Sequence, residues 1–194
     1  DVDVIQEAAT GLYGARCHND MLIMDCGDIG PSYQPGHTHC DFLSYELMIA
    51  GQRVVVDTGV SEYEPGEQRH YARSTKAHNT VSVDGGEQSE IWGAFRVARR
   101  AKKRSAKAVH HKGGVEISGS YEGFFNGNLS AVPRFRHNRQ INVKFVKDGM
   151  AEIGVVDTID PLSDKGTGRQ HSIESYIHLH PDIGVRFSDT EEPE

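Results

Sequence analysis

The chain is predicted to be an all-β protein, an antiparallel multi-stranded β-sandwich with little helix. Strand signals recur from one end to the other, each a short alternating or β-branched run bounded by Gly, Pro, Asn or Asp. Turn sequences between these runs, such as Asp84-Gly85-Gly86, contain residues that tolerate positive φ in hairpins. Many short strands joined by hairpins are typical of antiparallel sheets, and residues 1–194 are predicted to form a single domain.

The clearest strand carries four large side chains on one face, a period of two: Leu43, Tyr45, Leu47 and Ile49. The full set of predicted strands is Met21–Asp25, Phe42–Ala50, Arg53–Asp57, Asn79–Asp84, Phe95–Ala101, Lys107–His111, Val115–Tyr121, Arg139–Lys147, Ala151–Ile159, Ser172–His180 and Gly184–Phe187. Further hairpin turns are predicted at Lys112-Gly113-Gly114, Asn126-Gly127-Asn128 and Asp148-Gly149. The best helical candidate is a turn or two near Glu64–Ala72. Residues 161–170 are predicted to be a flexible loop, and Asp189–Glu194 a frayed acidic end.

Composition narrows the class of protein. Hydrophobic residues make up 37% of a Gly-rich chain, and no apolar run approaches the ~20 residues of a membrane span. The net charge of −7 argues against attraction of the whole surface to nucleic acid. The basic run from Arg96 to Arg104 is either a solvated strand and turn or an element that faces a polyanion.

Two further features bear on compartment and completeness. Cys17, Cys26 and Cys40 follow no Cys-x-x-Cys or zinc-ribbon spacing, so they do not fix the compartment. The chain begins with Asp1 rather than Met, and we expect it to have been processed or excised from something longer.

Chemically active side chains gather between Gly36 and Val83. In an extended chain His37, His39 and Asp41 project from one face, roughly 6–7 Å apart along the backbone. One face can therefore hold a metal ligand beside a group left free for a substrate.

A zinc site is one way to use these groups. Imidazole nitrogen and carboxylate oxygen are ligands that Zn²⁺ accepts, and His39, Asp57 and His78 are one set that supplies them. A chain with 11 His also contains His-x-His pairs by chance, and His178-Leu179-His180 is a second pair. Asp41 either orients His39 or is only a polar residue in a tight turn.

Five stretches, taken in order, resemble the C-terminal β-sandwich domain of the heparinase II/III-like polysaccharide lyases. They are GHTHCDFLSYEL, VVVDTG, the polar excursion from Tyr63 to Arg73, STKAHNTVSVDGGEQ and the Phe95-Arg96 pair. The match is dense from Gly27 to Val97 and weaker afterwards. The resemblance implies a supersandwich-like fold. It also implies that an N-terminal helical toroid, absent from this chain, forms the other wall of the substrate cleft.

The resemblance also implies roles at matching positions. His39, Asp57 and His78 stand where the family's zinc ligands stand, while His37 matches an active-site His and Tyr63 a Tyr in the cleft. One departure is a Cys at position 40, where the family has a small residue such as Ala. That Cys could compete for metal or be oxidised. The larger departure is the missing toroid, which in the family supplies another catalytic Tyr and the groups that meet the uronate carboxylate.

Such lyases cleave acidic polysaccharides next to a uronic acid by β-elimination. A base removes the C5 proton and an acid protonates the leaving O4, and His37 and Tyr63 are the candidates, with the direction of proton flow open. Arg69 and Arg73 are candidates for binding the uronate carboxylate, or they belong to a solvated loop. We expect the isolated chain to be inactive without its upstream domain.

Two other functions compete. A metal-dependent cupin also places His-x-His ahead of a Glu, but Glu46 lies too far beyond the pair and no second motif follows. A noncatalytic carbohydrate-binding or scaffolding sandwich with a structural metal is the other alternative. A periplasmic or secreted location is implied by the resemblance alone. The particular uronate polysaccharide and the oligomeric state do not follow from the sequence.

Overall fold

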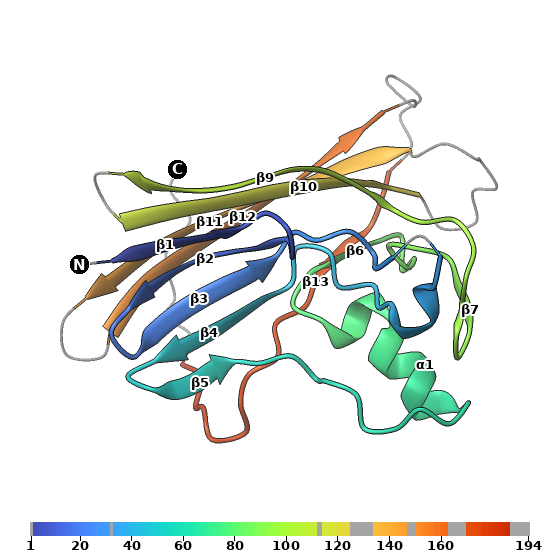
Figure 1. Ribbon diagram of the computed structural model, residues 1–194, viewed down its shortest axis with the longest axis horizontal. Helices are drawn as coiled ribbons and strands as arrows, with labels where there is room; N and C mark the ends of the chain where they lie inside the picture. The colour runs from blue at the N-terminus through green and yellow to red at the C-terminus, as the bar shows by residue number, and fades with distance from the viewer. Residues whose placement is uncertain are drawn as a thin grey trace.

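Two antiparallel sheets face each other in a sandwich (Figure 1). The computed structural model describes residues 2–31, 33–111, 114–124, 134–146, 150–162 and 170–186. The first sheet has the strand order β1 (Asp3–Glu7), β2 (Leu12–Cys17), β3 (Asp20–Asp25), β4 (Tyr45–Ile49) and β5 (Gln52–Val55). The second has the order β12 (Met150–Pro161), β11 (Phe135–Val146), β10 (Gly114–Gly123) and β9 (Lys102–His111). Both are antiparallel meanders, so the predicted fold class is confirmed.

The core lies between the two sheets. Leu22 and Met24 of β3 and Ile117 of β10 are fully buried, because alternate residues of each strand face inward. Core side chains fill the space over Gly119 of β10, where an added Cβ would lie 2.6 Å from Leu43 Cδ2. Burial of this apolar surface is the main term that stabilises the sandwich.

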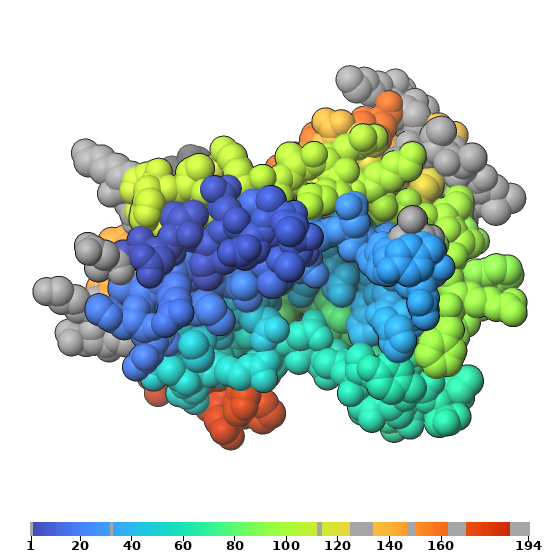
Figure 2. Space-filling view, in the orientation of Figure 1, coloured from blue at the N-terminus to red at the C-terminus, as the bar shows by residue number. Residues whose placement is uncertain are grey.

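The segment between β5 and β9 leaves the sandwich and forms one end of the molecule (Figures 1 and 2). It contains α1 (Glu67–Arg73), β6 (Val81–Val83), β7 (Ile91–Gly93) and β8 (Arg96–Val97). β6 pairs with β13 (Ile173–Ser175), and β7 pairs with β8. The helical turn predicted near Glu64–Ala72 is confirmed as α1. None of the helices described is long and apolar enough to cross a membrane.

The structure corrects several predicted boundaries. β1 and β2 were not predicted. The strand predicted over Phe42–Ala50 begins only at Tyr45, because Leu43 adopts a left-handed conformation with φ 62° that ends any extended run. The predicted strand Ser172–His180 is paired at β13 and again at the bridge between Val55 and Leu179. Gly184–Arg186 is not a strand.

The turn predicted at Asp84-Gly85-Gly86 is present, but it does not join paired strands. Asp84 and Gly85 both have positive φ, and the Gly86 N–H donates to Val83 O at 3.0 Å. The predicted hairpin is wrong here, because β6 pairs with β13 and β7 with β8. The remaining predictions for loops and ends lie outside the described residues: 112–113, 126–128, 147–149, 163–169, Phe187 and 189–194.

Candidate metal centre and active-site face

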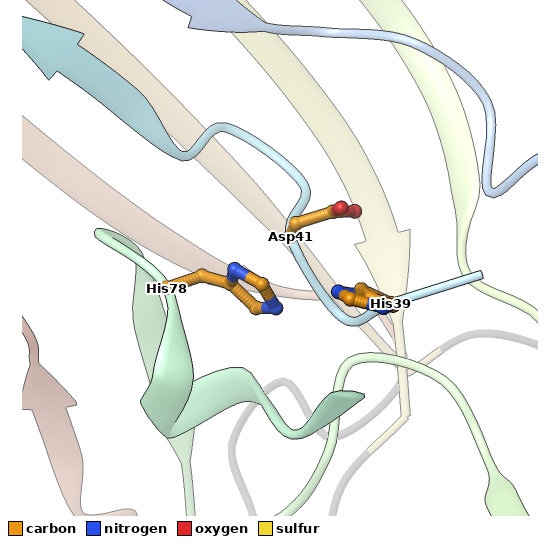
Figure 3. Close-up of side chains that lie close together, drawn as sticks. All are labelled: His39, Asp41 and His78. Atoms are coloured by element: carbon orange, nitrogen blue, oxygen red, sulfur yellow. The ribbon is translucent and has the colours of Figure 1, made fainter. Parts of the chain in front are cut away.

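His39, Asp41 and His78 come together at the base of the segment that leaves the sandwich (Figure 3). One potential ligand atom from each lies within 4.8 Å of the others. His39 and Asp41 belong to the stretch leading into β4, and His78 follows the 3-10 turn Thr75–Ala77. His39 and Asp41 are two residues apart, and both side chains lie near the imidazole of His78, which comes from a distant part of the sequence.

Asp57 lies on the far side of that imidazole. Its Oδ2 is 2.6 Å from His78 Nδ1, and His78 is 1% exposed. Burial alone would lower the pKa of His78, but the hydrogen bond and charge of Asp57 outweigh it and raise the pKa. Burial acts against ionisation of Asp57 too, yet the same contact lowers its pKa. The pair is thus a tight hydrogen-bonded unit.

The other ring nitrogen of His78, Nε2, is buried and makes no hydrogen bond to any described residue. A buried polar atom without a partner costs free energy. A metal ion that accepts the lone pair of Nε2 would remove that cost. This orphaned atom is the observation that fits a metal ion.

His39 is held in a form that can bind a metal. Burial, aided by the neighbouring charges of His78 and Arg69, lowers the pKa of His39 to about 4. Its Nε2 lies 3.4 Å from Arg69 Nη1. The imidazole is therefore neutral near pH 7, which is the protonation state required of a ligand.

His39, Asp41, Asp57 and His78 all line one pocket of about 200 Å³. Asp25 lies at the same pocket, and burial together with the charge of Asp41 raises the pKa of Asp25 to about 6. Burial also raises the pKa of Asp41. Carboxylates that lie so close disfavour one another's ionisation, and a bound cation would relieve that repulsion. The donor set of two imidazoles and carboxylates is one that Zn²⁺ accepts.

Cys40 is separated from this group. Its side chain is fully buried, and its Sγ lies 3.5 Å from Ser89 O. Burial raises the pKa of the thiol well above its usual range, so the thiolate that would bind a metal is disfavoured. The three cysteines are all free thiols.

The side chain of Asn79, next to His78, hydrogen-bonds to three separate segments around the pocket. Its Nδ2 donates to Tyr45 O at 2.9 Å and to Val56 O at 3.0 Å, and its Oδ1 accepts from His178 N at 2.6 Å. The side chain is fully buried. The amide thereby joins β4, the residue before Asp57 and a C-terminal segment. Asn79 stands inside the STKAHNTVSVDGGEQ stretch, but nothing in the sequence pattern predicts this role.

His37 and Tyr63 meet at the surface. Their rings lie 5.5 Å apart between centroids in an edge-to-face arrangement, and both side chains are exposed. His37 does not share the face of His39 and Asp41, because it ends a 3-10 turn that interrupts the extended run expected there. Arg69 connects the two groups: its guanidinium lies 5.1 Å from the Tyr63 ring centroid and also contacts His39.

Arg69 and Arg73 are not on an accessible surface. They are 1% and 0% exposed and donate to the protein's own backbone. Arg69 donates to Ala94 O and Gly36 O, and Arg73 to Thr38 O and Gly93 O. This placement corrects the expectation that they contact a substrate carboxylate directly, and makes them positioning residues for the loop that carries His37 and His39.

Glu46, which a cupin would need as a metal ligand, forms an ion pair with Arg53 at 2.6 Å. The described strands form open sheets rather than the closed barrel of a cupin. His178 was singled out only as part of a second His-x-His pair, yet its backbone pairs with Val56, whose N–H donates to His178 O at 2.9 Å. The C-terminal pair therefore lies beside the pocket.

Comparison with known protein families adds one finding. The family model described as heparinase II/III-like, C-terminal, matches residues 6–192, nearly the whole chain. No curated protein and no solved structure matches the chain.

Proposed function

Because the chain belongs to the heparinase II/III-like C-terminal domain family, we propose that it is the zinc-containing sandwich of a lyase that cleaves uronate polysaccharide by β-elimination. The observation that carries the proposal is the exposed pair of His37 and Tyr63, held by Arg69 against the pocket of His39, Asp41, Asp57 and His78. An acid–base pair at a surface and a ligand set beneath it are the parts that such a reaction requires from this wall of a cleft.

His37 and Tyr63 are proposed to carry the proton transfers. The imidazole and the phenol are close enough to act on neighbouring atoms of one sugar unit, one taking the C5 proton and the other protonating the O4 that leaves. Both are exposed, so a polymer can reach them without opening the fold. The C5 proton is a weak acid, so donors that stabilise the developing enolate-like charge contribute most of the rate.

Zinc is proposed to bind His39, Asp41 and His78 Nε2, the groups whose potential ligand atoms come together. Asp57, expected from the sequence as a ligand, is proposed instead to orient His78 through its contact with Nδ1. The orphaned His78 Nε2 and the neutral His39 support this assignment. When bound, zinc would supply positive charge at the base of the site and tie the stretch leading into β4 to the loop after α1. An exported location, periplasmic or secreted, is part of the proposal, since the substrate is a polysaccharide.

The chain alone is proposed to be inactive, because an upstream helical domain would supply the groups that grip the uronate. Losing half of a site whose members act as a unit removes nearly all the rate. Absorbance of the 4,5-unsaturated product, measured on a panel of uronate polysaccharides, tests this for the 194-residue chain and for a longer protein with its upstream domain. Activity of the longer protein should disappear with His37→Ala or Tyr63→Phe and persist with His110→Ala, an exposed His on β9. Cleavage by the short chain, or cleavage that survives His37→Ala, would overturn the proposal.

A further inference from the structure

A groove of about 680 Å³ lies between α1 and the end of β7, beside the His37–Tyr63 pair. Tyr71, His70 and Lys76 line one side, and Gly93 and Ala94 line the other. A volume of this size is within the range of small-molecule binding sites. Ala94 precedes Phe95, whose ring lies 6.4 Å from that of His37, so the groove continues the active-site face.

Buried hydrogen bonds hold the two sides of the groove together. Arg69 and Arg73 lie four residues apart on the inner face of α1, and they donate to Ala94 O and Gly93 O respectively. Because both guanidinium groups are buried, the groove is a preformed feature of the fold. A preformed site avoids the cost of ordering when a ligand binds.

Aromatic side chains are exposed along this end of the molecule. Tyr71 is 42% exposed, Phe95 46% and Trp92 65%. Single exposed aromatic residues are ordinary, but several on adjoining segments indicate an interaction surface. Two of them are paired with exposed cations: Lys76 Nζ lies 5.7 Å from the Tyr71 ring centroid, and the Arg96 guanidinium 5.9 Å from that of Trp92.

The charge beneath the groove favours an anion. The lining itself is balanced, with Lys76 against Glu67. Beneath it, neither Arg69 nor Arg73 forms an ion pair with any carboxylate of the described residues, and both are held by carbonyl oxygens. Buried cations without counterions project positive potential toward the nearest surface, here on a chain whose net charge is −7.

We propose that this groove binds an acidic sugar unit of the substrate chain, one or more units away from the bond that is cleaved. The Tyr71 ring packs against the apolar face of the sugar, and Lys76 binds its carboxylate or sulfate. The inference rests on the proposed function for the identity of the polymer. It goes beyond that function in assigning a binding site that contacts neither the reacting atoms nor the metal.

Trp92 provides the measurement, because it is the single Trp of the chain and precedes Gly93 in the groove. The 194-residue chain is titrated with three hexasaccharides: alginate, heparin and neutral cellohexaose. Both anionic probes should change the Trp92 fluorescence, with binding that weakens as salt is raised, and cellohexaose should not. A desulfated heparin hexasaccharide that binds as tightly as heparin would identify carboxylate as the group bound by Lys76, and one that loses binding would identify sulfate.

Variants locate the site. Lys76→Gln and Tyr71→Ala should each weaken binding about tenfold, the equivalent of one charge-assisted contact. Tyr71→Phe, which keeps the ring, should stay within about twofold, as should the matched charge control Lys144→Gln on β11. Equal binding of cellohexaose, no response to any probe, or unchanged binding by Lys76→Gln and Tyr71→Ala would overturn the groove.

Binding and cleavage fail separately. In the longer protein, Lys76→Gln and Tyr71→Ala should raise KM about tenfold with little change in kcat, because they act on a remote sugar. If both variants cleave the substrate with an unchanged KM, the groove is not a binding site, but the proposed function is unaffected. Binding by the groove in a protein that yields no unsaturated product would remove the proposed function and leave the groove.

Discussion

The side-chain amide of Asn79 donates to the carbonyl oxygen of Val56 at 3.0 Å, and this bond joins the residue after His78 to the residue before Asp57. The two side chains that share the 2.6 Å contact are therefore fixed by a buried amide as well as by each other. The Asn79 backbone is also engaged, since its N–H donates to Ser44 Oγ and its carbonyl oxygen accepts from Arg139 Nη1. Asn79 connects the pocket to both sheets.

Replacing Asn79 with Ala should lower the free energy of unfolding by about 2–4 kcal/mol, because buried groups in three segments lose their partner. Zinc affinity should fall as well, by about 10–100-fold, since ligand orientation is lost. Urea unfolding and a zinc competition titration measure the two effects. The control is Asn138→Ala, whose amide makes an exposed hydrogen bond to Asp160. Equal losses in the two variants would contradict the role given to Asn79.

A second network of buried side chains lies within the second sheet and centres on Asp157, which joins β12 to β11. Arg139 binds both carboxylate oxygens of Asp157 at 2.8 Å, and His137 Nε2 lies 2.7 Å from one of them. Although burial opposes ionisation, these contacts hold the pKa of Asp157 well below its ordinary value. Burial lowers the pKa of His137 despite that carboxylate, so His137 donates as a neutral imidazole.

The lowered carboxyl pKa of Asp157 contributes stability above the unfolded value of 3.8, and that contribution is lost progressively as pH falls below 3.8 and through the folded pKa. Asp157→Asn should therefore cost about 3–5 kcal/mol at pH 7, because Arg139 keeps a buried charge without its partner. The difference from the parent chain should shrink as pH falls below about 4. Urea unfolding at several pH values measures it, with the exposed Asp160→Asn as control. A difference that stays constant down to pH 2 would exclude the carboxylate as its source.

The tight packing of core side chains over Gly119 predicts an overpacking effect. Gly119→Ala would place a methyl group 2.6 Å from Leu43 Cδ2 and 2.7 Å from Cys26 Sγ, both in the core. We expect a loss of about 1–3 kcal/mol. Gly154→Ala on β12 is the matched control, because nothing lies within 4 Å of its added Cβ. The melting temperatures of both variants test this prediction. A Gly119→Ala variant that melts at the temperature of the parent chain would mean that the core accommodates the methyl group.

The metal assignment predicts an order among variants. His39→Ala and Asp41→Asn should each abolish stoichiometric zinc, since each removes a proposed ligand. Asp57→Asn should weaken zinc binding by about 10–100-fold, because Asp57 orients His78 through Nδ1. Glu46→Gln is the control, because Glu46 lines the same pocket but pairs with Arg53. Metal analysis after dialysis and the zinc-dependent rise in melting temperature report the order. A chain that takes up no zinc, or one in which Glu46→Gln alone removes it, contradicts the assignment.

Much of this fold could be predicted from the sequence because strand alternation is a local property. Leu47 and Ile49 pack on the core as their period of two predicts. β1 and β2 were missed because they are short and contain Gly and polar residues; pairing along β3 and contact with β9 stabilise them, which no local pattern encodes.

The site was predicted in part, for the same reason. His39 and Asp41 share a face through local alternation, but the approach of His78 and Asp57 depends on tertiary contacts. Arg69 and Arg73 were expected in a solvated loop or on a substrate. Their spacing of four places both on the side of α1 that packs inward, and Ala72 between them is buried too. That spacing was the available signal for their burial.

The C-terminal segment has a consequence for how the chain folds. His178 reaches Asn79 across a separation of 99 positions, and Tyr176 N and His180 N donate to Thr80 O and Val54 O beside the same pocket. Contacts of such long sequence separation form late, because their loop-closure entropy must be overcome first. During synthesis the His39, Asp57 and His78 segments emerge well before their clamp. The pocket is therefore clamped only when residues 176–180 arrive, and in a ribosome-bound chain that stops short of them Asn79, Thr80 and Val54 lack these partners.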